Sequence, residues 1–114
     1  MTVLRFDPGV AELNAEHQKR FGRPADPITG PAYACVQILA AALAKAGAPD
    51  REKVRDAIAA TDMTTVIGPV KFRPDGTGVV GSVFIQWQNG KQELVWPKEF
   101  ATAPLAYPAP PYSK

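Results

Sequence analysis

The 114 residues suffice for one domain with a modest core, and 46% hydrophobic with 21% charged residues is an ordinary globular composition, which argues against disorder. The net charge of +2 comes from 13 basic and 11 acidic residues without a basic cluster, so we expect no nucleic-acid partner. Cys35 is the only cysteine, so no intrachain disulfide can form, and its apolar helical surroundings predict a small buried side chain rather than a nucleophile.

The first eight residues lack the apolar core and the small-residue cleavage site of a signal peptide. The longest apolar stretch, residues 32–46, is interrupted by Gln37 and Lys45 and is too short to cross a membrane. Taken alone, these features predict a chain that stays in the cytoplasm.

The first predicted helix covers residues 10–21. Its apolar and aromatic side chains recur every three or four residues, as in an amphipathic helix: Val10, Leu13, His17 and Phe21. Glu16 and Arg20 form a favourable pair one turn apart on the outer face, and Gly22 predicts the end of the helix.

Two further helices are predicted over residues 29–47 and 50–60. Thr29 is the expected N-cap of the second helix and Asp50 that of the third, because their side-chain oxygens can accept a hydrogen bond from a backbone N–H of the first turn. The second helix is apolar nearly all round, which predicts burial on most of its sides.

Beyond residue 65 the pattern becomes extended, and strands are expected over residues 65–72, 79–88 and 92–96. A turn at Asp75-Gly76 separates the first two, and Asn89-Gly90, a strong hairpin signal, joins the last two. Three helices followed by a three-stranded β segment could form a small α+β unit. We expect one domain over residues 1–103 and a Pro-rich tail over residues 104–114.

This set of elements leaves the second helix insufficiently covered. One hairpin and two short amphipathic helices cannot bury all its sides, and leaving one face in water would forfeit several kcal/mol at ~25 cal/mol per Å² of apolar surface. The sequence therefore predicts a covering surface outside this chain, either the rest of a parent protein or a partner subunit.

No pattern favours catalysis. One His and one Cys cannot build a metal site, and neither a nucleophile–base pair nor a cofactor motif is present, so we expect no catalytic residue, metal or cofactor. Glycines 76 and 78 follow a strand but open no helix, so they do not form a phosphate loop. Glu93 and Glu99 are expected as surface charges. Trp87 and Trp96 are expected in core or hinge packing rather than stacked on a sugar or aromatic ligand.

Several short motifs follow one another in an order found in a transport family. They are Phe21-Gly22-Arg23-Pro24, Ala32-Tyr33-Ala34-Cys35-Val36-Gln37, Glu52-Lys53-Val54-Arg55-Asp56-Ala57, Gly68-Pro69, Asp75-Gly76, Gln86-Trp87, Asn89-Gly90-Lys91 and Tyr107-Pro108-Ala109-Pro110-Pro111. In this order they resemble the type I periplasmic solute-binding proteins of ABC transporters, which capture leucine, isoleucine, valine and related amino or aromatic acids. The resemblance extends over about residues 9–112.

The resemblance implies that the chain is a C-terminal part of one lobe in a protein whose two α/β lobes close on a solute, with the last strands passing through the hinge. Its implied partners are the small-molecule solute, an amino acid or an aromatic or branched carboxylate, and the membrane permease of the transporter. Such a parent is exported, so it is periplasmic and this chain lacks the parent's own N-terminus.

The family position nearest the cleft is the start of the second helix, so the resemblance implies Thr29, Gly30 and Tyr33 as ligand-binding residues. A helix N-terminus suits a carboxylate, and an aromatic ring could wall an apolar side chain. The alternative for Tyr33 is a half-buried core tyrosine. Relatives carry an Asp after this tyrosine where the chain has Ala34, so any hydrogen bond of that carboxylate is missing here.

An alternative to the transport function is a stand-alone truncated module that self-associates and binds no small molecule. As an isolated chain, either version is expected to form homo-oligomers through the second helix and the hairpin, with exchanged elements as one route.

Overall fold

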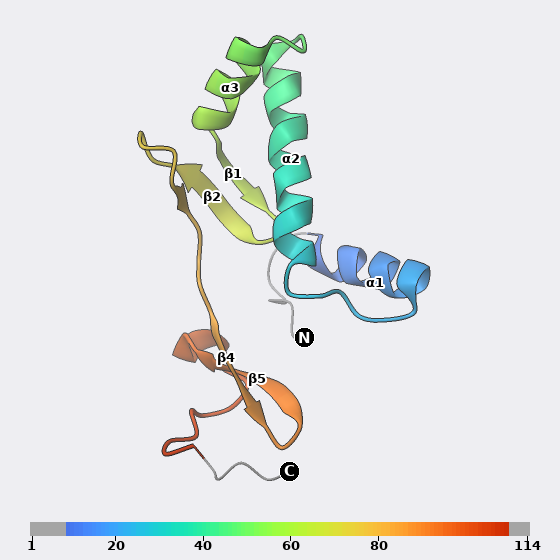
Figure 1. Ribbon diagram of the computed structural model, residues 1–114, viewed down its shortest axis with the longest axis vertical. Helices are drawn as coiled ribbons and strands as arrows, with labels where there is room; N and C mark the ends of the chain where they lie inside the picture. The colour runs from blue at the N-terminus through green and yellow to red at the C-terminus, as the bar shows by residue number, and fades with distance from the viewer. Residues whose placement is uncertain (1–8, 110–114) are drawn as a thin grey trace. The chain divides into compact units, whose positions relative to one another are not determined.

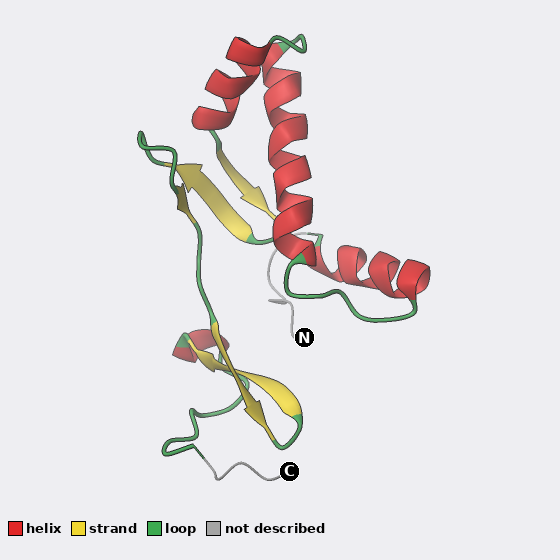
Figure 2. Ribbon diagram, viewed as in Figure 1, coloured by secondary structure: helices red, strands yellow, loops and turns green. Residues whose placement is uncertain are grey.

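The computed structural model describes residues 9–109, in which three helices precede five strands (Figure 1). The chain divides into two units within this range, residues 9–81 and residues 82–109. All three α-helices belong to the first unit, whereas the second consists of a hairpin, one 3-10 turn and a loop (Figure 2).

Helix α1 (Val10–Phe21) has the predicted bounds and the predicted ends. The guanidinium of Arg20 donates to Glu16 at 2.6 Å, one helical turn away. Gly22 takes a left-handed φ of 67°, and its amide donates to the carbonyl of Gln18, which closes the helix.

Helices α2 (Thr29–Ala46) and α3 (Arg51–Ala59) also match their predicted ranges. The cap on α3 is confirmed, because Asp50 accepts a hydrogen bond from the Lys53 amide at 2.9 Å. The predicted cap on α2 is wrong: Thr29 is already helical, and its hydroxyl accepts from the Asp26 amide at 3.2 Å. The Thr29 amide in turn donates to the Asp26 carbonyl, so the chain has turned before the position where Thr29 was expected to cap.

The first sheet has the order β1-β2-β3 and is antiparallel throughout: β1 (Asp62–Thr65), β2 (Gly68–Phe72) and β3 (Gly78–Val79). The prediction of one strand over residues 65–72 is therefore wrong, because a tight turn at Val66 and Ile67 divides this region. Thr65 donates its hydroxyl to the Gly68 carbonyl and accepts from the Ile67 amide, and Gly68 adopts a φ of 97° that few other residues tolerate.

The second unit contains the hairpin of β4 (Phe84–Gln88) and β5 (Lys91–Trp96), followed by η1 (Lys98–Phe100). The Asn89-Gly90 turn is confirmed, with φ of 51° and 75°, the positive values that a tight hairpin turn requires. The predicted strand over residues 79–88 is interrupted at residues 80–83, because the pairing of β2 ends at Val79 and that of β5 ends at Phe84.

The core of the first unit lies where α1, α2 and the β1–β2 turn meet. Val10, Ala34 and Val66 are buried there, and Leu13 and Ile67 pack against them. The side-chain oxygen of Gln37 accepts a hydrogen bond from the Val66 amide at 3.0 Å, which fastens α2 to the turn.

Most of α2 remains uncovered by the described chain. Its fully buried positions are Gly30, Ala34 and Ala42, whereas Tyr33, Val36, Leu39 and Leu43, which we call the α2 apolar face, are 40 to 63% exposed. Cys35 is also exposed, so its predicted burial is wrong for this chain. Trp87 and Trp96, expected in core or hinge packing, are 66% and 51% exposed, so neither belongs to a core of the described chain.

No single helix in residues 9–109 is long and apolar enough to span a membrane; α2 and α3 meet the length and composition test only together, as a pair bent by 120°.

Candidate functional site

The three predicted ligand-binding residues lie in the first turns of α2 and differ in accessibility. Gly30 is buried, Thr29 is partly buried and Tyr33 is 47% exposed, so the Tyr33 ring is open to a ligand in this chain. The glycine has a steric reason. A Cβ atom on Gly30 would lie 3.3 Å from the Cγ2 atom of Ile67, so the close approach of α2 to the β1–β2 turn favours glycine.

The loop before α2 is held by side chains of α1 and by an ion pair within the loop. Asn14 on α1 accepts a hydrogen bond from the Ala25 amide at 3.0 Å, and Arg23 forms an ion pair with Asp26 at 2.7 Å. The Nδ1 atom of His17 lies 3.0 Å from the carbonyl oxygen of Arg23. These contacts fix the direction in which the chain enters α2, and thereby the place of Thr29 and Gly30.

Much of the hydrogen-bonding capacity at this helix end is already used. The amides of Thr29 and Ala32 donate to the carbonyls of Asp26 and Ile28, and Pro31 has no amide hydrogen. Within residues 9–109, the Gly30 amide is the one of the first four helical positions that has a hydrogen and no acceptor. A carboxylate at this end would therefore meet one amide donor and the positive end of the helix dipole.

Ala34 lies one residue beyond Tyr33 and is 1% exposed, in contact with Val10 and Val66. The methyl group thus belongs to the apolar core and does not face the ligand side of the helix end. An aspartate at this position would place its carboxylate among hydrocarbon groups of this chain.

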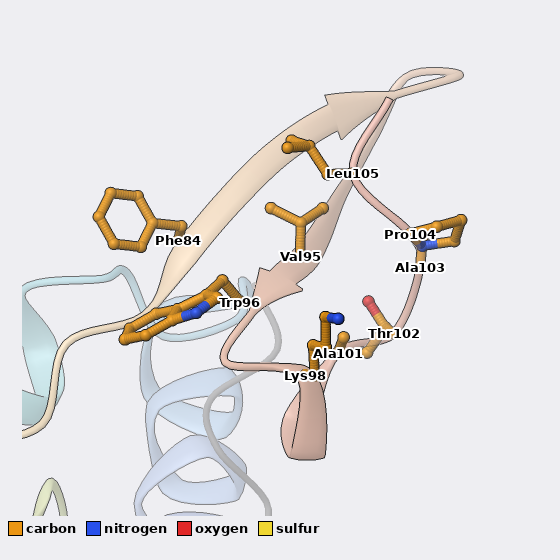
Figure 3. A pocket seen from close by; sticks show the side chains of 9 residues that line it. All are labelled: Phe84, Val95, Trp96, Lys98, Ala101, Thr102, Ala103, Pro104 and Leu105. Atoms are coloured by element: carbon orange, nitrogen blue, oxygen red, sulfur yellow. The ribbon is translucent and has the colours of Figure 1, made fainter. Parts of the chain in front are cut away.

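A second candidate site was not predicted from the sequence. A hollow of about 800 Å³ lies in the second unit, between the hairpin and the loop that follows η1 (Figure 3). Its lining is apolar apart from Lys98 and Thr102: Phe84, Val95, Trp96, Lys98, Ala101, Thr102, Ala103, Pro104 and Leu105. The rings of Phe84 and Trp96 stand edge to face with centroids 5.6 Å apart. The apolar side chains after η1 could have indicated this hollow, but the proline content of the segment favoured an extended tail.

Side chains of the hairpin hold the loop wall of this hollow. The Gln86 amide group bonds both backbone groups of Ala106, at 2.9 and 3.0 Å, and Gln88 donates to the Pro104 carbonyl at 2.8 Å. On the other strand, Leu94 donates its amide to the Thr102 hydroxyl, and Leu94 accepts at its carbonyl from the Thr102 amide at 2.8 Å. The hollow is therefore framed by two segments that are fastened to each other.

The described part of the chain offers no metal-binding arrangement. Among residues 9–109, no group of three His, Cys, Asp or Glu side chains could hold a metal ion. The ring of His17 packs against Phe21 with centroids 4.7 Å apart and bonds the loop, which is a structural use of the histidine.

Solved structures with the same fold are about three times as long as this chain. The leucine-binding protein LivK from Thermotoga maritima matches 77% of this chain and 25% of its own, with a TM-score of 0.68 and 20% identity. An ABC transporter protein from Rhodopseudomonas palustris matches 75% and 26%, with a TM-score of 0.61 and 26% identity. A solute-binding protein from R. palustris, solved in complex with benzoate, matches 90% and 28%, with a TM-score of 0.68 and 19% identity.

The chain thus spans about a quarter of these solved proteins and has the α/β fold of a partial lobe, as the resemblance implied. The family model described as periplasmic binding protein matches residues 5–92, more than half of the sequence. The chain therefore belongs to the periplasmic binding protein family.

Proposed function

We propose that this chain is a C-terminal portion of one lobe in an ABC-transporter solute-binding protein whose solute is an amino acid or an aromatic or branched carboxylate. The family match over residues 5–92 carries the proposal. Among the solved proteins of this fold, one is a leucine-binding protein and one was solved with benzoate. Both compounds combine a carboxylate with an apolar body, which supports a solute of this class here.

The contribution of this chain to the solute site is the start of α2. The Gly30 amide and the helix dipole favour the carboxylate, and the exposed ring of Tyr33 supplies an apolar wall for the body of the solute. Thr29 contributes mainly by position, because its hydroxyl already accepts from the Asp26 amide.

The mechanism is closure of two lobes around the solute. A solute that contacts both lobes binds the closed form more tightly and shifts the population toward it, which the permease then recognises. This assigns the parent protein to the periplasm, with the permease as its membrane partner. Binding needs the second lobe, so this chain alone is expected to bind such a solute poorly.

The remainder of the lobe supplies the cover that α2 lacks. The four large side chains of the α2 apolar face stay 40 to 63% exposed among residues 9–109. A helix apolar on this side is stable when a sheet or another helix buries it. We assign residues 1–103 to the lobe and residues 104–114 to a tail, of which residues 104–109 are described and are bonded to the hairpin.

The test is a thermal-shift screen of amino acids and carboxylates on the full-length protein that carries this segment. Binding of a solute of the proposed class raises the melting temperature, and Tyr33→Ala then weakens its affinity about tenfold through loss of apolar contact. Tyr107→Ala, an exposed tyrosine of the tail, is the control and leaves affinity unchanged. A solute of another class refutes the proposed solute, and equal effects of the two variants refute the site.

A stand-alone module that self-associates is the second candidate, and the exposure of the α2 apolar face favours it. In that case a second copy covers the face and no solute binds. A dimer that binds neither leucine nor benzoate is expected of the isolated chain in either case, so the length of the natural gene product separates the two: a product of this chain's own length supports the module, and a longer one that binds a solute supports the lobe.

A further inference from the structure

The hollow of the second unit differs in kind from the α2 apolar face. The face consists of uncharged side chains on the outside of a helix, whereas the hollow is concave and has Lys98 in its lining. Concave apolar sites of roughly 300–1,000 Å³ with a few polar groups are the usual form of small-molecule sites, and the hollow, at about 800 Å³, falls in this range.

The walls of the hollow are fixed by the fold of the unit. The Gln86 and Gln88 side chains hold the loop at Ala106 and Pro104, and Thr102 is bonded to the backbone of Leu94. Because β4 and β5 are both hydrogen-bonded to this loop, movement of the loop into the hollow would break several of these hydrogen bonds. A ligand would enter a space that is already formed, so little ordering opposes its binding.

The positive charge of Lys98 in the lining favours a ligand with an anionic group. Lys98 forms no ion pair within residues 9–109, and it is the only charged side chain of the lining. The Glu93 carboxylate nearby in sequence accepts the Thr102 hydroxyl and does not line the hollow. An unpaired ammonium beside aromatic and aliphatic walls complements a compound with one anionic group and an apolar body.

We propose that the hollow binds an apolar monocarboxylate. Its body packs against Phe84, Trp96 and Leu105, and its carboxylate accepts a hydrogen bond from the Lys98 ammonium. This site lies within the second unit and does not include Thr29, Gly30 or Tyr33, so it does not depend on the proposed solute site of the lobe.

The test is titration of the chain with sodium octanoate, followed by calorimetry and by amide chemical shifts, with octan-1-ol as the uncharged probe of equal length. Octanoate binds, its shifts gather at residues 94–105, and octan-1-ol binds about tenfold more weakly because it lacks the charge. Lys98→Gln removes this preference, whereas Lys91→Gln, a cation of the same unit outside the lining, preserves it. Ala101→Leu, which adds volume to the hollow, abolishes binding while the circular dichroism spectrum stays native.

Several results would overturn the proposal: no binding of octanoate at millimolar concentration, equal affinity for octan-1-ol, or shifts gathered in the first unit. The first unit has a smaller hollow of about 400 Å³ between α2 and α3, next to Arg51 and Arg55, so the shifts discriminate between the two places. Shifts at residues 94–105 that depend on protein concentration without octanoate would also overturn it, because a second copy would then occupy the hollow. None of these results bears on Tyr33 in the full-length protein.

Discussion

At the scale of single residues, the side chain of Ala34 contributes to the core of the first unit and not to a ligand site. The resemblance placed it where relatives carry an aspartate, next to Tyr33 of the proposed solute site. In the structure it is buried against Val10 and Val66, so the loss of the carboxylate is a matter of packing in this chain.

Ala34→Asp is therefore expected to destabilise the first unit by about 3–5 kcal/mol, because the carboxylate would be buried without a partner. Ala41→Asp, at an exposed position of the same helix, is the matched control and is expected to cost less than about 1 kcal/mol, mainly through helix propensity. Urea unfolding followed by circular dichroism measures both. Equal losses would mean that the Ala34 position is open to water.

Asp75 gives a residue-scale prediction about pH. Its carboxylate accepts from the Thr77 amide at 2.9 Å and from the Thr77 hydroxyl at 2.7 Å, and these hydrogen bonds hold the pKa of Asp75 below its usual value of 3.8. Because the folded pKa lies below the unfolded one, the contribution of this turn is present above the unfolded pKa. It is lost as the pH falls through the folded pKa.

An NMR titration of the Asp75 carboxyl carbon checks this, with a midpoint below 3.8 as the expected result. Thr77→Val removes the hydroxyl and keeps the amide, so the midpoint is expected to rise and still to stay below that value, since the backbone bond has the larger effect. A midpoint at or above the usual value in the unchanged chain would contradict the turn geometry.

At the scale of elements, the helices could be predicted because their signals are local. Spacing, the Asp50 cap and the Gly22 stop depend on residues within one or two turns, and all three were correct. The bounds of the strands, in contrast, depend on pairing with other segments of the chain. The sequence did not reveal β1, because its pairing with β2 depends on the Thr65 hydroxyl and on the positive φ of Gly68. The hollow could not be predicted, because it is formed by contacts between the hairpin and the segment after η1, which are separated in the sequence.

Besides the packing of Ala34 against Val66, one hydrogen bond from the Val66 amide to the Gln37 side chain joins α2 to the β1–β2 turn. Gln37→Leu leaves this partly buried amide without an acceptor and is expected to cost about 1–3 kcal/mol of unfolding free energy. Gln18→Leu, at an exposed position of α1, is the control and is expected to stay within about 0.5 kcal/mol. Amide hydrogen exchange at Val66 distinguishes a local effect from general loss of stability, and unchanged protection there would contradict the role of Gln37.

At the scale of the whole molecule, residues 9–109 leave apolar surface uncovered among themselves. The buried residues of the first unit are few and small, and the α2 apolar face remains exposed. Burial of such surface stabilises by roughly 25 cal/mol per Å², so the face is expected to find a partner wherever one is available. We expect this partner to be the rest of the lobe in the proposed parent and a second copy in the isolated chain.

Size-exclusion chromatography with light scattering across a concentration series is expected to give a dimer or larger species. Leu39→Glu puts a charge in the α2 apolar face and is expected to shift the chain toward monomer, because a buried unpaired carboxylate opposes association. Ala41→Glu, exposed on the same helix outside that face, leaves association unchanged. A folded monomer at every concentration would refute the need for a covering surface.

The contact of Thr102 with Leu94 has a consequence for the outer edge of β5. An outer strand presents unpaired amides and carbonyls, and these can recruit a strand of another molecule into a growing fibre. Thr102 occupies both backbone groups of Leu94 on β5, and the prolines around it cannot continue a ladder of donors. These contacts cover the outer edge of β5 at Leu94, so we expect loss of the residues after Pro97 to expose this position to pairing with a strand of another molecule.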